Sequence, residues 1–278
     1  FQMKVAITGG TGFVGRYVVK ELLDLGLEVL ILTTSPERVL QFHWCDKVNV
    51  IKVDINLPIS NELLDQLNGI QKLIHLAWTG LPNYNNPIHF EKYLIPQYHF
   101  LKSIIEFGIC DITISGTCFE YGKREGCITS DMLTNPNTYY GLAKDTLHKL
   151  LVLLQKNETF VLKWIRLFYL FGEGQAESTI LGSLKAAINN GDQTFNMSLG
   201  KQERDYLPVQ DAAKKLVNQA ILVNDNCTVN CCSGIPISIE SLVENFVNQN
   251  NAKIELNKGY YPYNVYEPMS FWGHNDCD

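Results

Sequence analysis

Short apolar runs and segments of helical periodicity alternate along the chain up to residue 167. The apolar runs predict buried β-strands at residues 5–7, 28–32, 48–53, 73–77, 109–115 and 159–167. Between these runs, apolar positions three and four residues apart predict helices at 14–25, 61–67 and 89–107. Residues 135–156 are predicted to form a loop followed by a long amphipathic helix. This alternation predicts an α/β protein with a doubly wound parallel sheet.

The regular alternation stops after residue 167. The remaining periodic segments predict a seventh strand at 226–232 and helices at 180–190 and 238–248. We expect a first domain over residues 1–167, to which residues 205–232 return. The other residues should form a smaller, interleaved substrate lobe, made of 168–204 and 233–278.

Three glycines follow the first predicted strand with the spacing G-x-x-G-x-x-G: Gly9, Gly12 and Gly15. A strand, a glycine turn and a helix in this order are the context in which such glycines bind a dinucleotide. Glycine lets the backbone approach a pyrophosphate closely, and the free N–H groups at the helix start face the anion. We predict dinucleotide contacts from these three glycines and from Phe13 and Val14; an ordinary turn with incidental glycines is the alternative.

The end of the second predicted strand bears on the choice between NAD and NADP. A carboxylate there would bind the ribose hydroxyls and repel a 2′-phosphate, but the strand runs into Thr33, Thr34 and Ser35, followed by Arg38. Hydroxyls and an arginine can hold a phosphate, so NADP(H) is favoured and NAD(H) is the alternative. Glu37 weakens this preference, and Arg38 could equally be a solvated residue at a helix start.

Two further strand ends should meet the cofactor. Asp54 and Ile55 follow the third predicted strand and are placed to meet the adenine ring. Ala77 and Trp78 end the fourth predicted strand and should pass beneath the cofactor. Because the carboxyl ends of parallel strands lie at one edge of a sheet, these residues should meet the glycine turn there.

Tyr140 and Lys144 are four residues apart in a predicted helix, so they lie on one face of it. A phenol with a pKa of about 10 is a poor proton carrier at neutral pH. A nearby ammonium, together with the positive charge of an oxidised nicotinamide, stabilises the phenolate and lowers its pKa toward the working range. The pair therefore predicts a catalytic tyrosine and lysine, although this spacing alone occurs by chance in many proteins.

Composition and charge narrow the range of partners. Of the 278 residues, 46% are hydrophobic and 19% charged, and the formal net charge of −6 argues against nucleic acid as a partner. No apolar run reaches the roughly 18 to 20 residues of a membrane span, and from this sequence we expect no secretory segment. The eight cysteines include no matched C-x-x-C pairs, so we expect no metal site and free thiols in a cytoplasmic protein.

The combination of these features resembles the extended short-chain dehydrogenase/reductase family, also called the NAD-dependent epimerase/dehydratase family. The run S-G-T-C-F-E-Y-G at residues 115–122 is similar to the family's motif at a strand end, which usually ends V-Y-G. The resemblance implies a Rossmann domain and places the catalytic hydroxyl on Thr117, with Ser115 as the fallback. It also implies that Thr117 binds the substrate carbonyl beside Tyr140, while Lys144 tunes Tyr140 and binds the nicotinamide ribose.

Two later segments extend the resemblance. Residues 166–175 are similar to the family's R-x-x-N-x-Y-G-P-G-Q, with Tyr169 in place of Asn, and residues 200–211 to G-x-x-x-R-D-(F/Y)-x-x-V-x-D. By this resemblance Arg204 clamps the pyrophosphate of a nucleotide sugar; a surface ion pair is the alternative. The resemblance also places Phe168 at the cofactor and implies these substrate contacts: Thr79, Cys118, Phe119, Tyr169, Leu181, Lys185 and Arg204.

By resemblance, members of this family are dehydratases, epimerases or reductases of nucleotide-linked sugars. Dehydratases carry Asp-Glu directly after the catalytic Thr, where this chain has Cys118 and Phe119. Strand alternation points Cys118 elsewhere, so we expect a buried, inert thiol there. We expect a homodimeric, NADPH-dependent reductase of the C4 ketone of a dTDP- or CDP-linked 4-keto-6-deoxyhexose, in deoxysugar and surface polysaccharide biosynthesis. The alternatives are an NAD-dependent nucleotide-sugar 4-epimerase and a non-catalytic NADP sensor on the same fold.

Overall fold

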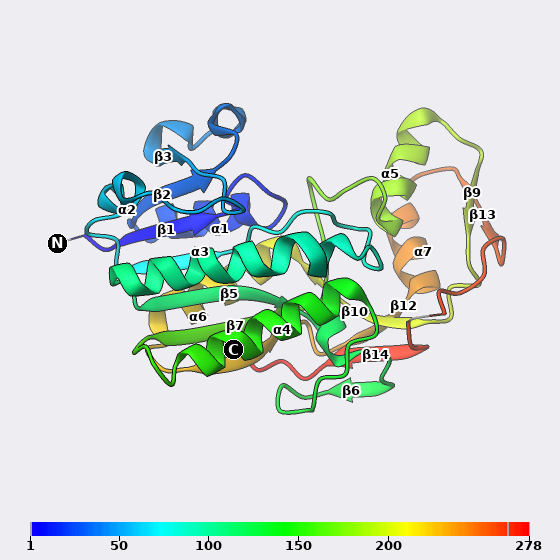
Figure 1. The fold of residues 1–278 in the computed structure, drawn as a ribbon. Coiled ribbons are helices and arrows are strands. Elements are labelled where there is room, and N and C mark those ends of the chain that lie inside the picture. Colours follow the sequence, from blue (N-terminus) through cyan, green and yellow to red (C-terminus); the bar gives the residue numbers. More distant parts are fainter. Residues whose placement is uncertain (1, 266, 278) are drawn as a thin grey trace.

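The computed structural model describes residues 2–265 and 267–277 and shows a seven-stranded sheet flanked by helices (Figure 1). The order of the strands is β11-β7-β5-β4-β1-β2-β3, and all neighbouring strands are parallel. The strands are β1 (Lys4–Thr8), β2 (Glu28–Thr33), β3 (Asn49–Lys52), β4 (Lys72–His75), β5 (Asp111–Thr117), β7 (Val161–Leu167) and β11 (Cys227–Cys231). The prediction of a doubly wound parallel α/β sheet is confirmed.

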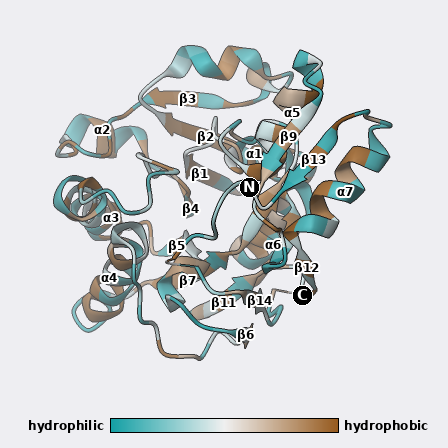
Figure 2. Cartoon of the chain, turned by 90° about the vertical axis from the view of Figure 1, so that its right-hand side faces the viewer, coloured by the Kyte–Doolittle hydropathy of each residue, from teal (hydrophilic) through white to brown (hydrophobic). Residues whose placement is uncertain are grey.

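The two faces of this sheet carry separate hydrophobic cores because side chains alternate along each strand. Ala6 packs in the core beneath α3 (Leu94–Phe107) and α4 (Tyr139–Leu154). Val5 and Ile7 pack in the opposite core beneath α1 (Gly15–Asp24) and α6 (Val209–Leu222). Figure 2 shows the hydrophobic colour of β1 and β2 between these helix layers. Each helix buries one side only, which explains the helical periodicity of its apolar positions.

The last third of the chain builds most of a second, smaller body (Figure 1). Its helices α5 (Ile180–Asn190) and α7 (Ile239–Gln249) share a core with the parallel strands β9 (Thr194–Met197) and β13 (Glu255–Lys258). Next to them lies a sheet of order β12-β10-β14-β6, in which β8 also pairs with β10. Its strands are β6 (Gly126–Ile128), β8 (Tyr169–Phe171), β10 (Glu203–Pro208), β12 (Pro236–Ser238) and β14 (Ser270–Gly273).

Helix α6 and the short strands of the second body are absent from the elements predicted above. The signal for α6 is present in the sequence, since Val209, Ala212, Ala213 and Leu216 are buried at helical spacing. Strand β9 alternates, with Phe195 and Met197 buried, but it is only four residues long. Strand β13 leaves three of its four side chains exposed, so no clear alternation marks it. The division of the chain into two domains stays a prediction. Within the described residues, no helix is long and apolar enough to cross a membrane.

Candidate active site

The glycine turn after β1 is tight, and two of its glycines have backbone directly beside them. Gly9 has a φ of +72°, and a Cβ there would lie 2.8 Å from Ala77 N, just after β4. A Cβ at Gly15 would lie 1.9 Å from Gly9 O, so α1 reaches the turn only because residue 15 lacks a side chain. Gly12 N donates to Gly9 O (3.0 Å) and closes the turn.

The amino end of α1 is open toward a ligand. Its N-cap residue, Val14, makes no side-chain cap hydrogen bond, and Gly12, Phe13 and Val14 are all partly exposed. An α-helix leaves its first N–H groups without partners inside the helix, and these groups attract an anion. Because this helix end lies at the carboxyl edge of the parallel sheet, it fits the pyrophosphate of a dinucleotide.

The end of β2 carries hydroxyl groups beside this turn, since β2 is the direct neighbour of β1. Ser35 N donates to Thr33 Oγ1 (3.1 Å), which curls the chain at the strand end. Thr34 is exposed, and so is Arg38 in the 3₁₀ helix at Pro36–Gln41. These side chains form a polar rim without a carboxylate at the strand end itself.

The ends of β3 and β4 complete the same edge of the sheet. The Asp54 carboxylate accepts the backbone N–H two residues further on (2.9 Å), and Ile55 is buried. Ala77 N donates to Thr8 Oγ1 (3.2 Å), which fixes the chain next to the glycine turn. The structure therefore gathers most of the predicted cofactor residues along one edge.

Thr117, Tyr140 and Lys144 are brought together at the carboxyl end of β5. Thr138 caps α4 by accepting a backbone N–H of its first turn (3.1 Å), which places Tyr140 in that turn. Lys144 follows one turn later and donates from Nζ to Ser115 O (2.8 Å). All three side chains are buried, and the Thr117 side chain lies close enough to Tyr140 to influence its pKa.

Burial disfavours the charged forms of both titratable groups in this cluster. Burial, with smaller contributions from Tyr84 and Glu120, raises the pKa of Tyr140, and the neighbouring Thr117 side chain opposes this rise. Burial also lowers the pKa of Lys144 to about 7, and the Glu120 carboxylate opposes this fall. Tyr140 is therefore a neutral phenol at pH 7 and can donate a proton.

Aromatic side chains cover Tyr140. Four rings have centroids 5.4 to 6.3 Å from that of Tyr140: His89, Tyr84, Trp78 and Phe119. Trp78 Nε1 donates to His89 Nδ1 (3.1 Å), and the Trp78 ring lies 4.4 Å from Lys144 Nζ. Because Nδ1 accepts, the His89 proton resides on Nε2 and is donated to Asn83 O (2.9 Å). Tyr84 and His89 are absent from the predicted site, since no sequence spacing connects them to Tyr140.

A series of aromatic rings extends from the rings around Tyr140 into the second body. Phe119, Tyr169, Tyr206 and Phe171 follow one another with centroid distances of 6.3, 5.5 and 6.4 Å. Tyr206 and Phe171 pack against the core of the second body, which contains the fully buried Leu181. Among the other predicted residues, the substrate contacts Thr79 and Lys185 are exposed, and the cofactor contact Phe168 is buried against Phe271.

The guanidinium of Arg204 already has protein partners. Its Nη2 and Nε donate to Glu267 Oε2 (2.8 and 3.2 Å), and its Nη1 donates to Glu203 O (2.7 Å). Arg204 also lies 5.8 Å from the centroid of the Tyr169 ring. Cys118 is 3% exposed, and burial raises the pKa of its thiol well above the usual range, with Glu267 adding to the effect. The expectation of a buried, unreactive thiol at Cys118 agrees with this environment.

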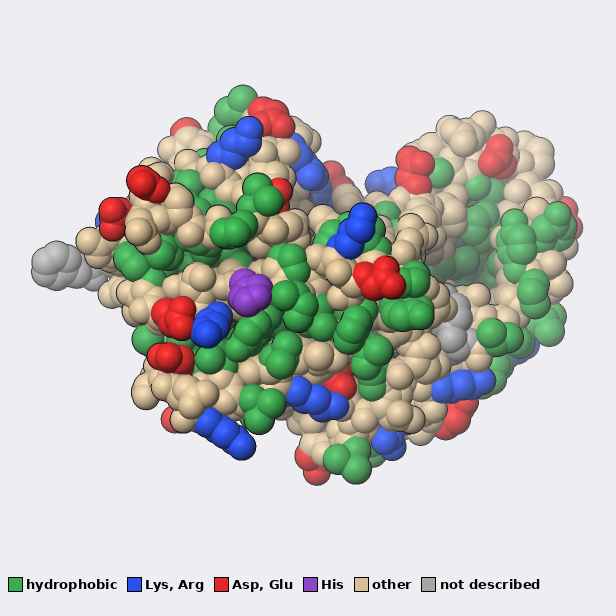
Figure 3. All heavy atoms as spheres, viewed as in Figure 1, with side chains coloured by type: hydrophobic (Ala, Val, Ile, Leu, Met, Phe, Trp, Pro, Cys, Tyr) green, Lys and Arg blue, Asp and Glu red, His purple; other side chains and the backbone are tan. Residues whose placement is uncertain are grey.

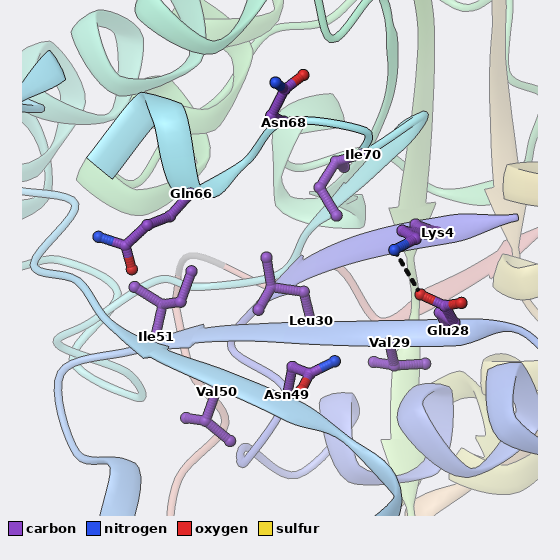
Figure 4. A pocket seen from close by; sticks show the side chains of 10 residues that line it. All are labelled: Lys4, Glu28, Val29, Leu30, Asn49, Val50, Ile51, Gln66, Asn68 and Ile70. Carbon is purple, nitrogen blue, oxygen red and sulfur yellow. Dashed lines mark ion pairs between the residues drawn. The ribbon is translucent and has the colours of Figure 1, made fainter. Parts of the chain in front are cut away.

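A surface hollow of about 370 Å³ lies away from this cluster, between β2, β3 and the end of α2 (Asn61–Gln66) (Figure 4). Lys4 and Glu28 line it and form an ion pair (2.9 Å) at the amino ends of β1 and β2. Ligands of open α/β sheets bind beyond the carboxyl ends of the strands. We therefore place the candidate active site at the glycine turn and Tyr140, and not in this hollow.

Three features together define an enzyme that uses a pyridine dinucleotide: a Rossmann-type sheet, a glycine turn that leads into the uncapped amino end of α1, and the buried cluster of Thr117, Tyr140 and Lys144. The chain belongs to the NAD dependent epimerase/dehydratase family, which matches residues 5–224. The resemblance described from the sequence is thereby confirmed. The expectation of an NAD(P)-dependent oxidoreductase is confirmed with it.

Two characterised relatives have names that refer to dTDP-linked 6-deoxyhexoses. The chain is 29% identical to dTDP-6-deoxy-L-talose 4-dehydrogenase (NAD(+)) of Aggregatibacter actinomycetemcomitans, over 98% of this chain and 99% of that protein. It is 24% identical to dTDP-4-dehydro-6-deoxyglucose reductase of Escherichia coli, over 86% of this chain and 79% of that protein.

Solved structures share the fold at lower identity. UDP-N-acetylglucosamine 4-epimerase from Methanobrevibacter ruminantium M1, in complex with UDP-N-acetylmuramic acid, superposes with a TM-score of 0.83 at 20% identity, over 98% of this chain and 90% of that chain. MoeE5 in complex with UDP-glucuronic acid and NAD superposes with a TM-score of 0.80 at 21% identity, over 97% and 90%. At these identities the two structures establish the fold alone.

Proposed function

We propose that this protein reduces the C4 ketone of a dTDP- or CDP-linked 4-keto-6-deoxyhexose with NADPH. The observation that carries the proposal is the buried cluster of Thr117, Tyr140 and Lys144 beside the open glycine turn. The two relatives whose names refer to dTDP-linked 6-deoxyhexoses support the substrate class and favour dTDP over CDP. A role in deoxysugar and surface polysaccharide biosynthesis belongs to the same proposal.

Each residue of the cluster has a distinct task in this reaction. A bound nicotinamide would supply a hydride to carbon 4 of the sugar. Tyr140, a neutral phenol, donates its proton to the ketone oxygen, so that a hydroxyl forms at carbon 4. Thr117 Oγ1 accepts from Phe119 N (3.3 Å), so its own O–H is left to donate toward the reacting oxygens. Lys144 lies one helical turn from Tyr140, and its positive charge stabilises the phenolate that forms.

The test is to incubate the protein with NADPH and dTDP-4-keto-6-deoxyglucose, or its CDP analogue, and to follow the consumption of NADPH. Tyr140→Phe should lower turnover about 10²- to 10⁴-fold, because the proton donor is lost, and should leave NADPH binding intact. If neither sugar consumes NADPH while NAD co-purifies with the protein, the reductase proposal fails and the 4-epimerase alternative is supported. Equal loss of turnover and NADPH binding would show that Tyr140 is mainly structural.

The preference for NADPH rests on the polar rim at the end of β2, where Thr33, Thr34 and the exposed Arg38 stand without a carboxylate at the strand end. A relative that is named for NAD(+) makes NADH the necessary comparison. The ratio of kcat/KM for NADPH and NADH decides between them. Arg38→Ala should reduce this ratio, because it removes the cation that we propose to bind the 2′-phosphate. An unchanged ratio would exclude Arg38 from the cofactor site.

Arg204 is proposed to bind the diphosphate of the sugar nucleotide in exchange for Glu267. Both are oxygen anions that a guanidinium binds through two N–H groups, and Arg204 is the buried cation next to Tyr169 on the path from Tyr140. The further substrate contacts stay part of this proposal: Thr79, Cys118, Phe119, Tyr169, Leu181 and Lys185.

We also propose that the protein is a homodimer and that it is located in the cytoplasm. Ile95 on α3 and Val152 and Leu153 on α4 are 50, 47 and 53% exposed, and hydrophobic side chains gather over these two helices in Figure 3. Contiguous apolar surface of this kind is typical of an interface between subunits. Light scattering after size exclusion should give twice the mass of the chain, and Leu153→Glu should give a monomer. The eight free thiols favour a reducing compartment.

A further inference from the structure

Glu120 is a fully buried carboxylate directly behind the proposed catalytic hydroxyl. Its exposed fraction is 0%. Oε1 accepts from Thr117 N (2.8 Å) and Trp164 Nε1 (3.0 Å), and Oε2 accepts from Trp164 Nε1 (3.1 Å) and Arg166 Nε (2.6 Å). Every partner is therefore a hydrogen-bond donor. Burying a carboxylate is costly unless it is paired and hydrogen-bonded, and here both conditions are met.

The backbone before Thr117 leaves room for this carboxylate. A Cβ at Gly116 would lie 2.6 Å from Glu120 Oε1 and 2.2 Å from Trp164 Nε1. A side chain at residue 116 would therefore push both groups away from the end of β5. The glycine in the S-G-T run thus serves the packing of Glu120 against the strand, and Glu120 stands where the family's motif usually has Val.

Arg166 is held from its other side, which makes the pair rigid. Its Nη1 donates to Tyr121 Oη (2.9 Å) and Ser130 O (3.0 Å). Tyr121 Oη in turn donates to Asn230 Oδ1 (2.6 Å) on β11. This network links β5, β7 and β11 behind the site. Among the described residues, none of these side chains has a buried polar atom without a partner.

The same carboxylate completes a reciprocal cap around Thr117. Thr117 Oγ1 accepts from Phe119 N (3.3 Å), while Glu120 accepts from Thr117 N, both at the amino end of the 3₁₀ turn Cys118–Tyr121. Both the main chain and the hydroxyl oxygen of Thr117 are thereby fixed. The Thr117 O–H is thereby left to donate, and Tyr140 lies close enough for Thr117 to influence its pKa.

We propose that Glu120 is the positioning residue for Thr117: anchored by Trp164 and Arg166, it holds the Thr117 main chain so that the hydroxyl meets Tyr140 and the substrate ketone. The inference rests on the proposed function in one respect, namely that Thr117 acts on the substrate. Because both Glu120 oxygens already accept from protein donors, we assign Glu120 a role through Thr117 and not a contact with the substrate.

Glu120→Gln tests the proposal, because the NH₂ group of glutamine must face one of the three donors. We expect kcat to fall about 10²-fold, the size expected for a misplacement of about 1 Å, with the KM for the sugar nucleotide nearly unchanged. Asp111→Asn is the matched control. Asp111 lies at the start of the same strand and its carboxylate also has only donors as partners, Lys72 and Lys163. This control should lose stability and keep the wild-type kcat.

A measurement without substrate separates this inference from the proposed function. In ¹⁵N-labelled protein, the Thr117 amide should exchange its hydrogen slowly in the wild type and in Asp111→Asn, and faster in Glu120→Gln. If the wild type turns over no sugar tested, the proposed function fails and this exchange still decides the inference. Unchanged exchange in Glu120→Gln, or a kcat equal to that of Asp111→Asn, would overturn it.

The unpaired Arg166 cation could destabilise Glu120→Gln, so a second variant removes that cation as well. Arg166→Met in the Glu120→Gln background should recover the unfolding temperature, because no buried charge is left without a partner. The low kcat and the fast exchange of the Thr117 amide should persist in this double variant. Recovery of kcat together with stability would show that Glu120 has only a structural role.

Discussion

Gly15→Ala should damage the glycine turn, and its effect follows from the geometry. A Cβ at residue 15 would lie 1.9 Å from Gly9 O and 2.7 Å from Gly9 C. Ordinary contacts begin at 3.4 Å, so α1 and the turn would have to separate by about 1.5 Å. Both obstructing atoms belong to the backbone, so no side-chain rotation relieves the clash. Overpacking of this kind lowers the free energy of unfolding by about 1 to 3 kcal/mol.

Gly12→Ala provides a matched comparison in the same turn. A Cβ at residue 12 meets a single atom within 4 Å, Gly9 O at 3.2 Å, so the turn needs to give by only about 0.2 Å. We expect a loss of less than about 1 kcal/mol in the free energy of unfolding, since most surface substitutions stay within that range. The new methyl group would nevertheless stand at the uncapped end of α1, where we expect the pyrophosphate to bind.

The two variants should therefore separate folding from cofactor binding. Urea unfolding measures the first property and titration with NADPH measures the second. We expect Gly15→Ala to lose both stability and NADPH affinity, and Gly12→Ala to lose mainly affinity. A Gly15→Ala protein that is as stable as the wild type would refute the clash argument. A Gly12→Ala protein with full affinity would remove the end of α1 from the cofactor site.

Two further predictions concern charges in and near the site. Burial lowers the pKa of Lys144 to about 7, so between pH 7 and the ordinary lysine value near 10.5 the native state binds fewer protons than the unfolded state, and this residue makes stability rise with pH. Lys144→Met should therefore raise the unfolding temperature at pH 7, and by less toward pH 10. A difference between variant and wild type that stays constant with pH would contradict the lowered pKa. Glu267→Gln should free Arg204 and lower the Kd for dTDP about tenfold in calorimetry. The control is Glu125→Gln, because the Glu125 carboxylate holds the same segment through Met269 N and Ser270 N; this variant should leave the Kd unchanged. Equal Kd values for both variants would show that Glu267 does not compete with the diphosphate.

Features that depend on neighbours in sequence could be predicted from the sequence. The central strands are covered on both faces, so they appear as continuous apolar runs, and the helices appear through their one-sided burial. Tyr140 and Lys144 share a helix face because four residues make about one turn. The positions of Gly9 and Gly15 follow from the strand-turn-helix geometry itself.

Contacts between distant segments could not be predicted in this way. Glu120 and Arg166 are 46 residues apart, and Arg204 and Glu267 are 63 apart. Neither separation repeats a helix or strand period, so no local pattern indicates these pairs. As a result, the motif predicts a phosphate clamp at Arg204 but gives no sign that the Glu267 carboxylate is already bound to it.

The choice between Thr117 and Ser115 illustrates the same limit. The two residues are two positions apart on β5, so their side chains point to the same face and alternation cannot distinguish them. In the structure their surroundings differ: Ser115 presents its carbonyl to Lys144 Nζ, whereas Thr117 lies close enough to Tyr140 to influence its pKa. Both contacts come from α4, which is distant in sequence from β5 and is placed against it by the core. The assignment of the catalytic hydroxyl therefore depends on how the helix packs against the strand end, and the motif alone does not decide it.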